Sequence, residues 1–208
     1  IVEPVQGEGG VNPAPAGYLE HVREITEDHG AAMIVDEIQT GLGRTGSMWA
    51  VDDVGVIPDV LTTAKGLANG LPMGATLCRD WIAEDPGDHG GTFSGGPLVS
   101  AAANATLDVI ADERLVDNAA EVGAYLRSAL ATAVGDQVRE VRGNGLMIGI
   151  EVKRGANRML RDLALDHQIL ALPAGRTVVR LLPPLVLEEA HADTIVEAIE
   201  AVVTEGSA

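Results

Sequence analysis

Two short apolar segments of the chain lead into residues that can do chemistry. The segment at residues 31–38 contains Asp36 and is followed by Gln39, and the segment at residues 59–64 is followed by Lys65. Short apolar runs bounded by glycine and proline predict buried strands of a parallel sheet. In open α/β sheets the ligand crevice lies beyond the carboxyl ends of the strands. We therefore expect the acid, the amide and the amine to meet in one crevice.

Lys65 is the sharpest candidate for a catalytic residue. A lysine in a water-poor crevice can lose its proton and attack an aldehyde to form a Schiff base. The alternative is a surface lysine at the start of a helix. Its neighbours Ala64, Gly66 and Ala68 are small enough to let a planar ring approach, which favours the catalytic interpretation.

Taken alone, Asp36 could equally be a carboxylate that caps a turn or a residue that binds a ligand. Beside Lys65 it could face a pyridine nitrogen and keep that nitrogen protonated, which makes the ring an electron sink. Gln39 could then donate to a phenolate oxygen, and Ile38 could pack on the face of the ring.

The composition excludes some classes of function. The chain has 208 residues, a formal net charge of -17 and 46% hydrophobic residues, so it can build a core but is poorly suited to neutralise nucleic-acid phosphates. Lysine occurs only at Lys65 and Lys153, while arginine supplies the other basic residues. An acidic chain that nearly lacks lysine indicates adaptation to high salt.

The single cysteine, Cys78, excludes an internal disulfide and fits a reducing cytoplasm, and we expect it to lie in the core. No apolar stretch approaches the length of a membrane span, there is no signal peptide, and the histidines show no metal-binding spacing. Because Ile1 already begins what reads as a strand, we expect the later part of a longer chain.

The order of the expected elements predicts two domains. Strands and helices alternate as far as a charged break after residue 112, as in an α/β layer, and residues 113–208 follow the order of a small α+β domain. The expected helices lie at residues 15–25, 48–54, 98–110, 116–133 and 157–167 and from 188, and the expected strands lie at residues 1–5, 31–38, 59–64, 75–78, 169–172 and 177–182, with two more within 138–152.

Six motifs occur in order along the chain. They are residues 3–10 (EPVQGEGG), 36–46 (DEIQTGLGRTG), 63–66 (TAKG), 91–98 (GTFSGGPL), 142–149 (RGNGLMIG) and 179–186 (VRLLPPLV). Together they resemble the class III aminotransferases, pyridoxal-phosphate enzymes of fold type I. The resemblance implies that residues 1–112 are the latter part of the large parallel-sheet domain and that residues 113–208 are the small C-terminal domain.

The resemblance implies cofactor-binding roles. Lys65 would bind the aldehyde of pyridoxal 5'-phosphate and move a proton between the substrate carbon and the cofactor. Asp36 would bind the pyridinium nitrogen, Ile38 would lie on the ring and Gln39 would bind the 3′-oxygen. Thr92 would reach the cofactor phosphate of the partner subunit, so the active unit would be a homodimer.

It also implies substrate-binding roles for two residues. Arg180 would hold the α-carboxylate of glutamate or 2-oxoglutarate, and Glu8 would pair with Arg180 and mask it when the other substrate is bound. From the residues alone, Arg180 is equally compatible with a salt bridge at the rim of the sheet, and Glu8 with a solvated charge in a glycine loop.

Within the family, residues 169–175 (ILALPAG), which run into Arg180, are most similar to the acetylornithine aminotransferase branch and to enzymes that act on ornithine or lysine attached to an amino-group carrier protein. The implied reaction moves an amino group between glutamate and the terminal aldehyde of such a blocked precursor in arginine or lysine biosynthesis. The alternatives are an ω-amino-acid transaminase, an aminomutase or a non-catalytic truncated subunit. Since the family's earlier phosphate-binding loop is not among these residues, we expect this chain alone to show little or no turnover.

Overall fold

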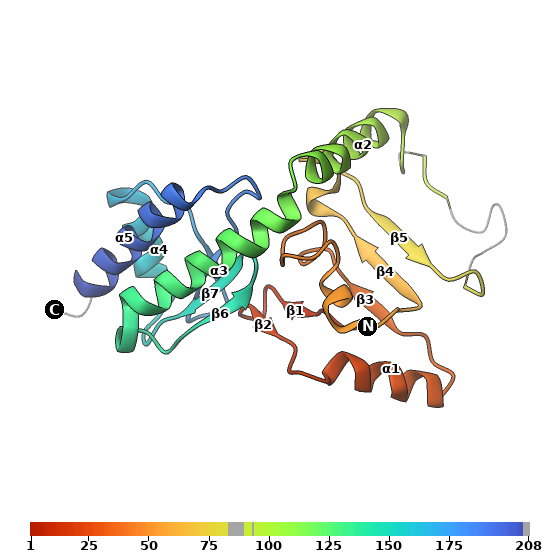
Figure 1. Cartoon of the computed structure of the whole chain (residues 1–208), viewed down its shortest axis with the longest axis horizontal. Helices are drawn as coiled ribbons and strands as arrows, with labels where there is room; N and C mark the ends of the chain where they lie inside the picture. Colours follow the sequence, from red (N-terminus) through yellow and green to blue (C-terminus); the bar gives the residue numbers. More distant parts are fainter. Residues whose placement is uncertain (83–89, 93, 206–208) are drawn as a thin grey trace.

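The computed structural model describes residues 1–82, 90–92 and 94–205 (Figure 1). Phe93, within the 91–98 motif, lies outside the described residues. The strands are β1 (Val5–Gln6), β2 (Asn12–Pro13), β3 (Ile34–Asp36), β4 (Val60–Thr63), β5 (Ala75–Cys78), β6 (Glu140–Asn144), β7 (Met147–Glu151), β8 (Leu172–Ala174) and β9 (Val178–Leu181). The α-helices are α1 (Tyr18–Asp28), α2 (Pro97–Asp112), α3 (Leu115–Val134), α4 (Ala156–Asp166) and α5 (Glu189–Glu205), and 3-10 helices span Ala50–Val54, Lys65–Ala68 and Gly135–Gln137.

The first sheet has the order β3-β4-β5 and contains the parallel pair that the sequence predicts. β3 and β4 run parallel, with Asp36 opposite Thr62, whereas β5 runs antiparallel to β4. The expected strand over residues 1–5 is wrong, because only Val2 bridges to this sheet, while β1 pairs with β2. Pro4, which lacks an amide N–H, separates the two pieces.

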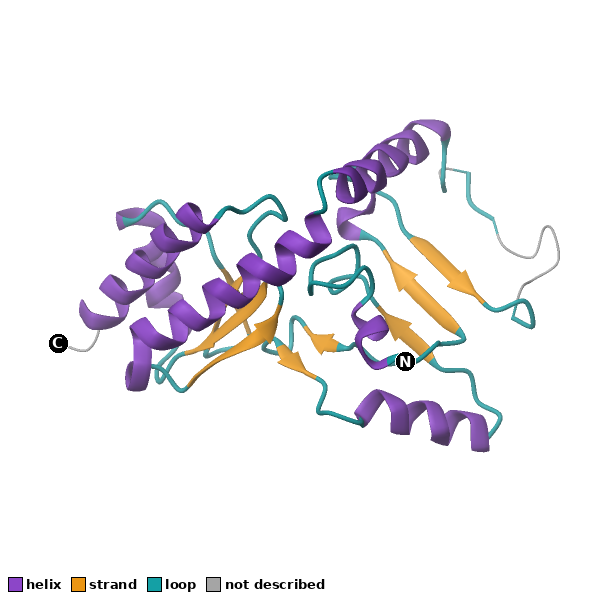
Figure 2. Cartoon of the chain, in the orientation of Figure 1, coloured by secondary structure: helices purple, strands orange, loops and turns teal. Residues whose placement is uncertain are grey.

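The second sheet has the order β6-β7-β9-β8, and every neighbouring pair in it is antiparallel. α3 contacts β6 and β7, α4 contacts β8 and β9, and α5 packs on α3 and α4, so the helices lie together beside this sheet (Figure 2). The largest apolar cluster of the chain lies between them and includes Leu126, Leu130, Ile148, Ile150 and Ile199, none of which is exposed to solvent. This is the α+β arrangement expected from residue 113 onward.

Backbone contact joins the two sheets through the glycine-rich loop of residues 41–46. Leu146 N donates to Arg44 O at 3.0 Å. A Cβ on Gly145 would lie 2.4 Å from Thr45 C, and a Cβ on Gly123 of α3 would lie 2.3 Å from Gly145 C. The loop, the β6–β7 turn and α3 therefore meet with no space for a side chain between them.

The expectation that Cys78 lies in the core is wrong, because the thiol is exposed. β5 lies at the end of its sheet, and three of its four residues are exposed. In the described part of the chain, no helix combines the length and the apolar character needed to cross a membrane.

We predict that Gly123→Ala destabilises the fold by about 2–3 kcal/mol, the typical cost of overpacking. Alanine normally stabilises a helix interior relative to glycine by about 1 kcal/mol, but here the added carbon would collide with the Gly145 backbone. Urea unfolding measures the change. Gly96→Ala, at the N-cap of α2, is the control for space alone, because a Cβ there meets no atom within 4 Å. Equal stability of the two variants would contradict the close packing.

Candidate active site

A cavity of about 940 Å³ opens between the two sheets at the carboxyl end of β4. Five of the seven site residues expected from the sequence line it, namely Glu8, Ile38, Gln39, Lys65 and Arg180. The segment that follows β9 contributes more of its wall through Leu182, Pro184, Leu185 and Val186. The cavity thus depends on both halves of the chain.

Lys65 is separated from the end of β4 by Ala64 alone, and it begins a 3-10 helix with a positive φ of 44°. Burial lowers the pKa of its amine below the usual 10.5, while the nearby Glu8 and Asp36 carboxylates oppose that shift and the Arg180 charge adds to it. Gly66 and Ala68 line the cavity beside it. Lys65 is an exposed residue whose amine is only partly desolvated, and the small residues beside it leave room for a flat group.

Asp36 is the last residue of β3 and lies opposite Thr62 of β4, so it stands at the same sheet edge as Lys65. Its Oδ1 accepts a hydrogen bond from Ile38 N at 3.0 Å. Asp36 lines a neighbouring cavity of about 640 Å³ with Glu3 and Gln6, rather than the cavity that Lys65 lines. The expected single crevice is therefore divided in this structure, although the charge of Asp36 still acts on Lys65.

Glu8, Gln39 and Arg180 form a hydrogen-bonded triangle in the wall of the larger cavity. Arg180 Nη1 donates to Glu8 Oε1 at 2.8 Å and to Gln39 Oε1 at 3.0 Å, and Gln39 Nε2 donates to Glu8 Oε1 at 3.0 Å. The Arg180 side chain is 5% exposed and that of Glu8 is 71% exposed. The hydrogen bonds from Arg180 and then Gln39 hold the pKa of Glu8 below the usual 4.5.

The triangle leaves part of Arg180 unsatisfied. Its Nε is buried and has no hydrogen-bond partner among the residues that the structure describes. An unpaired N–H on a buried guanidinium is costly, so Arg180 is suited to bind an anionic oxygen at the cavity wall.

Thr92 is exposed and lines neither cavity. The structure therefore does not bring it together with Lys65 or Asp36 in this chain. No group of three or more histidine, cysteine, aspartate or glutamate side chains within residues 1–82, 90–92 and 94–205 is arranged to hold a metal ion.

The family model described as Aminotransferase class-III matches residues 1–203. The chain belongs to the class III aminotransferases. It is 44% identical over 200 residues to an acetylornithine aminotransferase of Methanosarcina acetivorans, a match that covers 96% of this chain and 50% of that protein. It is 45% identical over 204 residues to a LysW-aminoadipate semialdehyde transaminase of Deinococcus radiodurans, covering 97% of this chain and 48% of that protein.

A solved structure of an amine transaminase from an uncultivated Pseudomonas species, in a PLP-bound form, superposes on this aminotransferase chain with a TM-score of 0.91 at 38% identity. The match covers 98% of this chain and 51% of that one. The fold is therefore that of these aminotransferases, and the chain spans about half the length of the curated relatives it matches.

Two further residues of this aminotransferase chain support the site and were not singled out from the sequence. Arg44 lines the cavity, donates to Leu146 O at 3.1 Å and to Pro183 O, and thus ties the glycine loop to the second sheet. Burial lowers the pKa of Arg44 to about 10. Its place in the 36–46 motif was visible, but its partners are more than 100 residues away.

Glu37, next to Asp36, is 1% exposed and supports the turn that carries Gln39. Its Oε2 accepts from Thr40 Oγ1, and its Oε1 accepts from Val51 N at 2.9 Å. Burial raises the pKa of Glu37 above the usual 4.5, and these hydrogen bonds only partly oppose the shift. Asp36 therefore lines a cavity, whereas the adjacent Glu37 is buried and stabilises the loop through its hydrogen bonds to Thr40 and Val51.

We predict that Glu37→Gln makes the chain more stable than the wild type at neutral pH. Because the folded-state pKa is raised, the folded chain binds the Glu37 proton more tightly than the unfolded chain, and wild-type stability falls as pH rises from about 4.5 through the folded-state value. Glutamine is neutral throughout, so the stability difference should vanish at low pH and grow as pH rises.

Thermal unfolding across this pH range measures the difference. Glu200→Gln is the control, because it removes the same charge from a position that is exposed rather than buried. A Glu37→Gln variant that is less stable than the wild type at every pH would contradict the assignment.

Proposed function

We propose that this chain carries the catalytic lysine of a pyridoxal 5'-phosphate-dependent aminotransferase. The reaction would move an amino group between glutamate or 2-oxoglutarate and the terminal aldehyde of an N-blocked ornithine or lysine precursor, in arginine or lysine biosynthesis. The observation that carries the proposal is the Lys65 amine, which has a lowered pKa and lies in the large cavity at the strand edge it shares with Asp36. The names of the two curated relatives support the substrate class.

The residues at this edge fit the cofactor chemically. Oδ1 of Asp36 accepts from Ile38 N at 3.0 Å, and a carboxylate at this position would form a charge-assisted hydrogen bond with a protonated ring nitrogen. The buried hydroxyl of Thr62, opposite Asp36, lacks a partner among the described residues. The apolar side chain of Ile38 lines the same cavity as Lys65.

When bound, the cofactor supplies an aldehyde that takes up the migrating amino group and a ring that stores an electron pair. Lys65 would bind that aldehyde and, once released by substrate, carry a proton at Nζ. Asp36 would hold a proton at the ring nitrogen, and Gln39 would donate its second amide hydrogen to the 3′-oxygen. Arg180 would hold the substrate carboxylate, in competition with Glu8.

Assembly and localisation belong to the same proposal. A homodimer would let the exposed Thr92 serve the cofactor phosphate of a second copy, and an amino-group carrier protein would present the blocked substrate. Residues 1–112 would act as part of the large cofactor-binding domain and residues 113–208 as the small domain. The cytoplasm, where amino-acid biosynthesis takes place, would be the site of action, and the acidic composition would suit high salt.

An ω-amino-acid or amine transaminase is the second candidate, because a solved amine transaminase is similar to this chain over 98% of its length. An enzyme of that kind need not use a carrier-linked substrate. In such an enzyme Arg180 would bind the carboxylate of the 2-oxo acid that accepts the amino group, and it would have no carboxylate to bind on an amine donor. A panel of blocked and unblocked amino donors therefore distinguishes the two candidates.

We predict that borohydride attaches pyridoxal phosphate covalently to Lys65 and that Lys65→Ala abolishes the attachment. The chain has only two lysines, and the exposed Lys153 provides a matched control whose alanine variant should label normally. Peptide mass spectrometry identifies the modified residue without requiring turnover. Labelling at Lys153 alone, or no labelling, would contradict the role of Lys65 in this chain.

We also predict that Arg180→Leu weakens 2-oxoglutarate binding at least about tenfold. A hydrogen bond to a charged group is worth about 1.5–3 kcal/mol, and each 1.4 kcal/mol corresponds to a factor of ten. Isothermal titration calorimetry measures the affinity. Arg176→Leu removes an equal charge from an exposed position nearby. The same loss in both variants, or none in Arg180→Leu, would show that Arg180 is not the carboxylate site.

A further inference from the structure

Glu8 lies in a short loop that has little regular structure of its own. β1 and β2, which flank the loop, are two residues each. Within it, Val11 has a positive φ of 52°, a conformation that β-branched residues rarely adopt, and Gly10 has a φ of 124°. A loop in this conformation needs contacts from outside to hold it, and these contacts determine where Glu8 lies.

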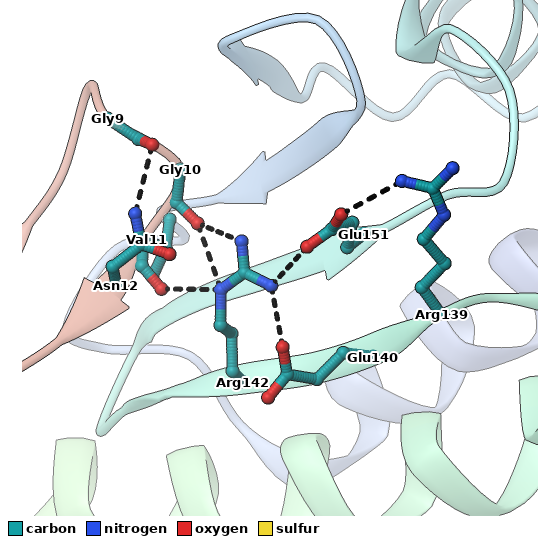
Figure 3. Close-up of polar contacts among 8 residues, drawn as sticks. All are labelled: Gly9, Gly10, Val11, Asn12, Arg139, Glu140, Arg142 and Glu151. Atoms are coloured by element: carbon teal, nitrogen blue, oxygen red, sulfur yellow. Dashed lines mark hydrogen bonds and ion pairs between the residues drawn. The ribbon is translucent and has the colours of Figure 1, made fainter. Parts of the chain in front are cut away.

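Arg142 of β6 supplies those contacts (Figure 3). Its Nε donates to Gly10 O at 3.1 Å and to Val11 O at 3.0 Å, and its Nη2 donates to Gly10 O at 2.8 Å. Its Nη1 donates to Glu140 at 2.7 Å and to Glu151 at 2.6 Å. The side chain is only 13% exposed, and these two carboxylates raise its pKa despite burial.

The register of the second sheet aligns this arginine with Arg180. Arg142 lies opposite Gly149, and Gly149 lies opposite Arg180, so the three residues form one row across β6, β7 and β9. Residues directly opposite in antiparallel strands point to the same face of the sheet. The two arginines therefore lie on one face, with a glycine between them.

The Glu8 loop fills the gap above that glycine. A Cβ on Gly149 would lie 2.9 Å from Val11 Cβ, so the Val11 side chain occupies the space that a side chain at position 149 would need. Val11 is fully buried and packs with Met147 and Val178. At one end of the row Arg142 binds the loop carbonyls, and at the other end Arg180 binds the Glu8 carboxylate.

We propose that Arg142 is a positioning residue that places Glu8 against Arg180 and thereby sets how readily Arg180 is released to a substrate carboxylate. Arg142 contacts neither cavity, so it acts only through the loop. The inference rests on the proposed function only where it treats Arg180 as a substrate site. The placement of Glu8 is a property of the chain itself and can be tested without cofactor or turnover.

The pKa of the Glu8 carboxyl, measured by NMR titration of the whole chain, reports this placement. The charged or hydrogen-bonding groups that act on it are Arg180, Gln39 and Lys65, and Arg142 is not among them. Displacing the loop should therefore raise the pKa of Glu8 toward 4.5 by weakening its bonds to Arg180 and Gln39, and not through the loss of a nearby charge.

We expect Arg142→Lys, which keeps the charge but cannot bind two carbonyls and two carboxylates at once, to raise the pKa of Glu8, and Arg142→Gln to raise it further. Arg139→Gln is the matched control. Arg139 pairs with Glu151 at 3.3 Å in the same network and does not touch the loop, so the pKa of Glu8 should stay at its wild-type value.

An unchanged Glu8 pKa in either folded Arg142 variant would overturn the proposal, as would an equal shift in Arg139→Gln. Circular dichroism establishes folding first. Loss of the fold in both Arg142 variants would also overturn it, because Arg142 would then be a general structural residue. Failure of cofactor labelling at Lys65, with the expected Glu8 shifts, would instead reject the proposed function and leave the positioning role intact.

Discussion

The cavity of this aminotransferase chain depends on a contact in which backbone segments touch directly, with no side chain between them. The 41–46 loop, the β6–β7 turn and α3 approach so closely at Gly123 and Gly145 that an added carbon would meet main-chain atoms within 2.4 Å. This contact sets the separation between the sheet that carries Lys65 and the sheet that carries Arg180. Arg44 reinforces it by donating to the carbonyl of Leu146 in the β6–β7 turn and to that of Pro183 after β9.

The charged residues that line the cavity are mainly basic, although the chain as a whole is strongly acidic. The formal net charge is -17, yet three basic residues, Arg44, Lys65 and Arg180, line the cavity, and Glu8 is the one acid among its described lining residues. A positive recess in an acidic surface favours small anions over other molecules of the same size. In this structure the Arg180 guanidinium in that recess is paired with the Glu8 carboxylate.

Local sequence patterns predicted much of the fold and part of the site. The parallel β3–β4 pair follows from apolar runs bounded by glycine and proline, and α2 from an alanine-rich stretch. Lys65 lies just beyond the end of β4, close to where the sequence placed it. The strand predicted over residues 31–38 extends too far at its C-terminal end. Glu37 N still donates a hydrogen bond to Thr62 O, but the chain turns after Glu37. Arg142 and Arg44 were missed because their importance comes from contacts more than 100 residues away, which no local period encodes. The separate cavities of Asp36 and Lys65 likewise depend on tertiary packing.

The fit of Val11 above Gly149 has an evolutionary consequence. Val11 carries a branched side chain in a backbone conformation that disfavours such side chains. Its side chain fills the space that a side chain at position 149 would need, and position 149 is a glycine. A larger residue at 149 would be tolerated only with a smaller one at 11, where glycine would also relieve the strained backbone. The two positions should therefore change together among related chains, as a covarying pair far apart in sequence.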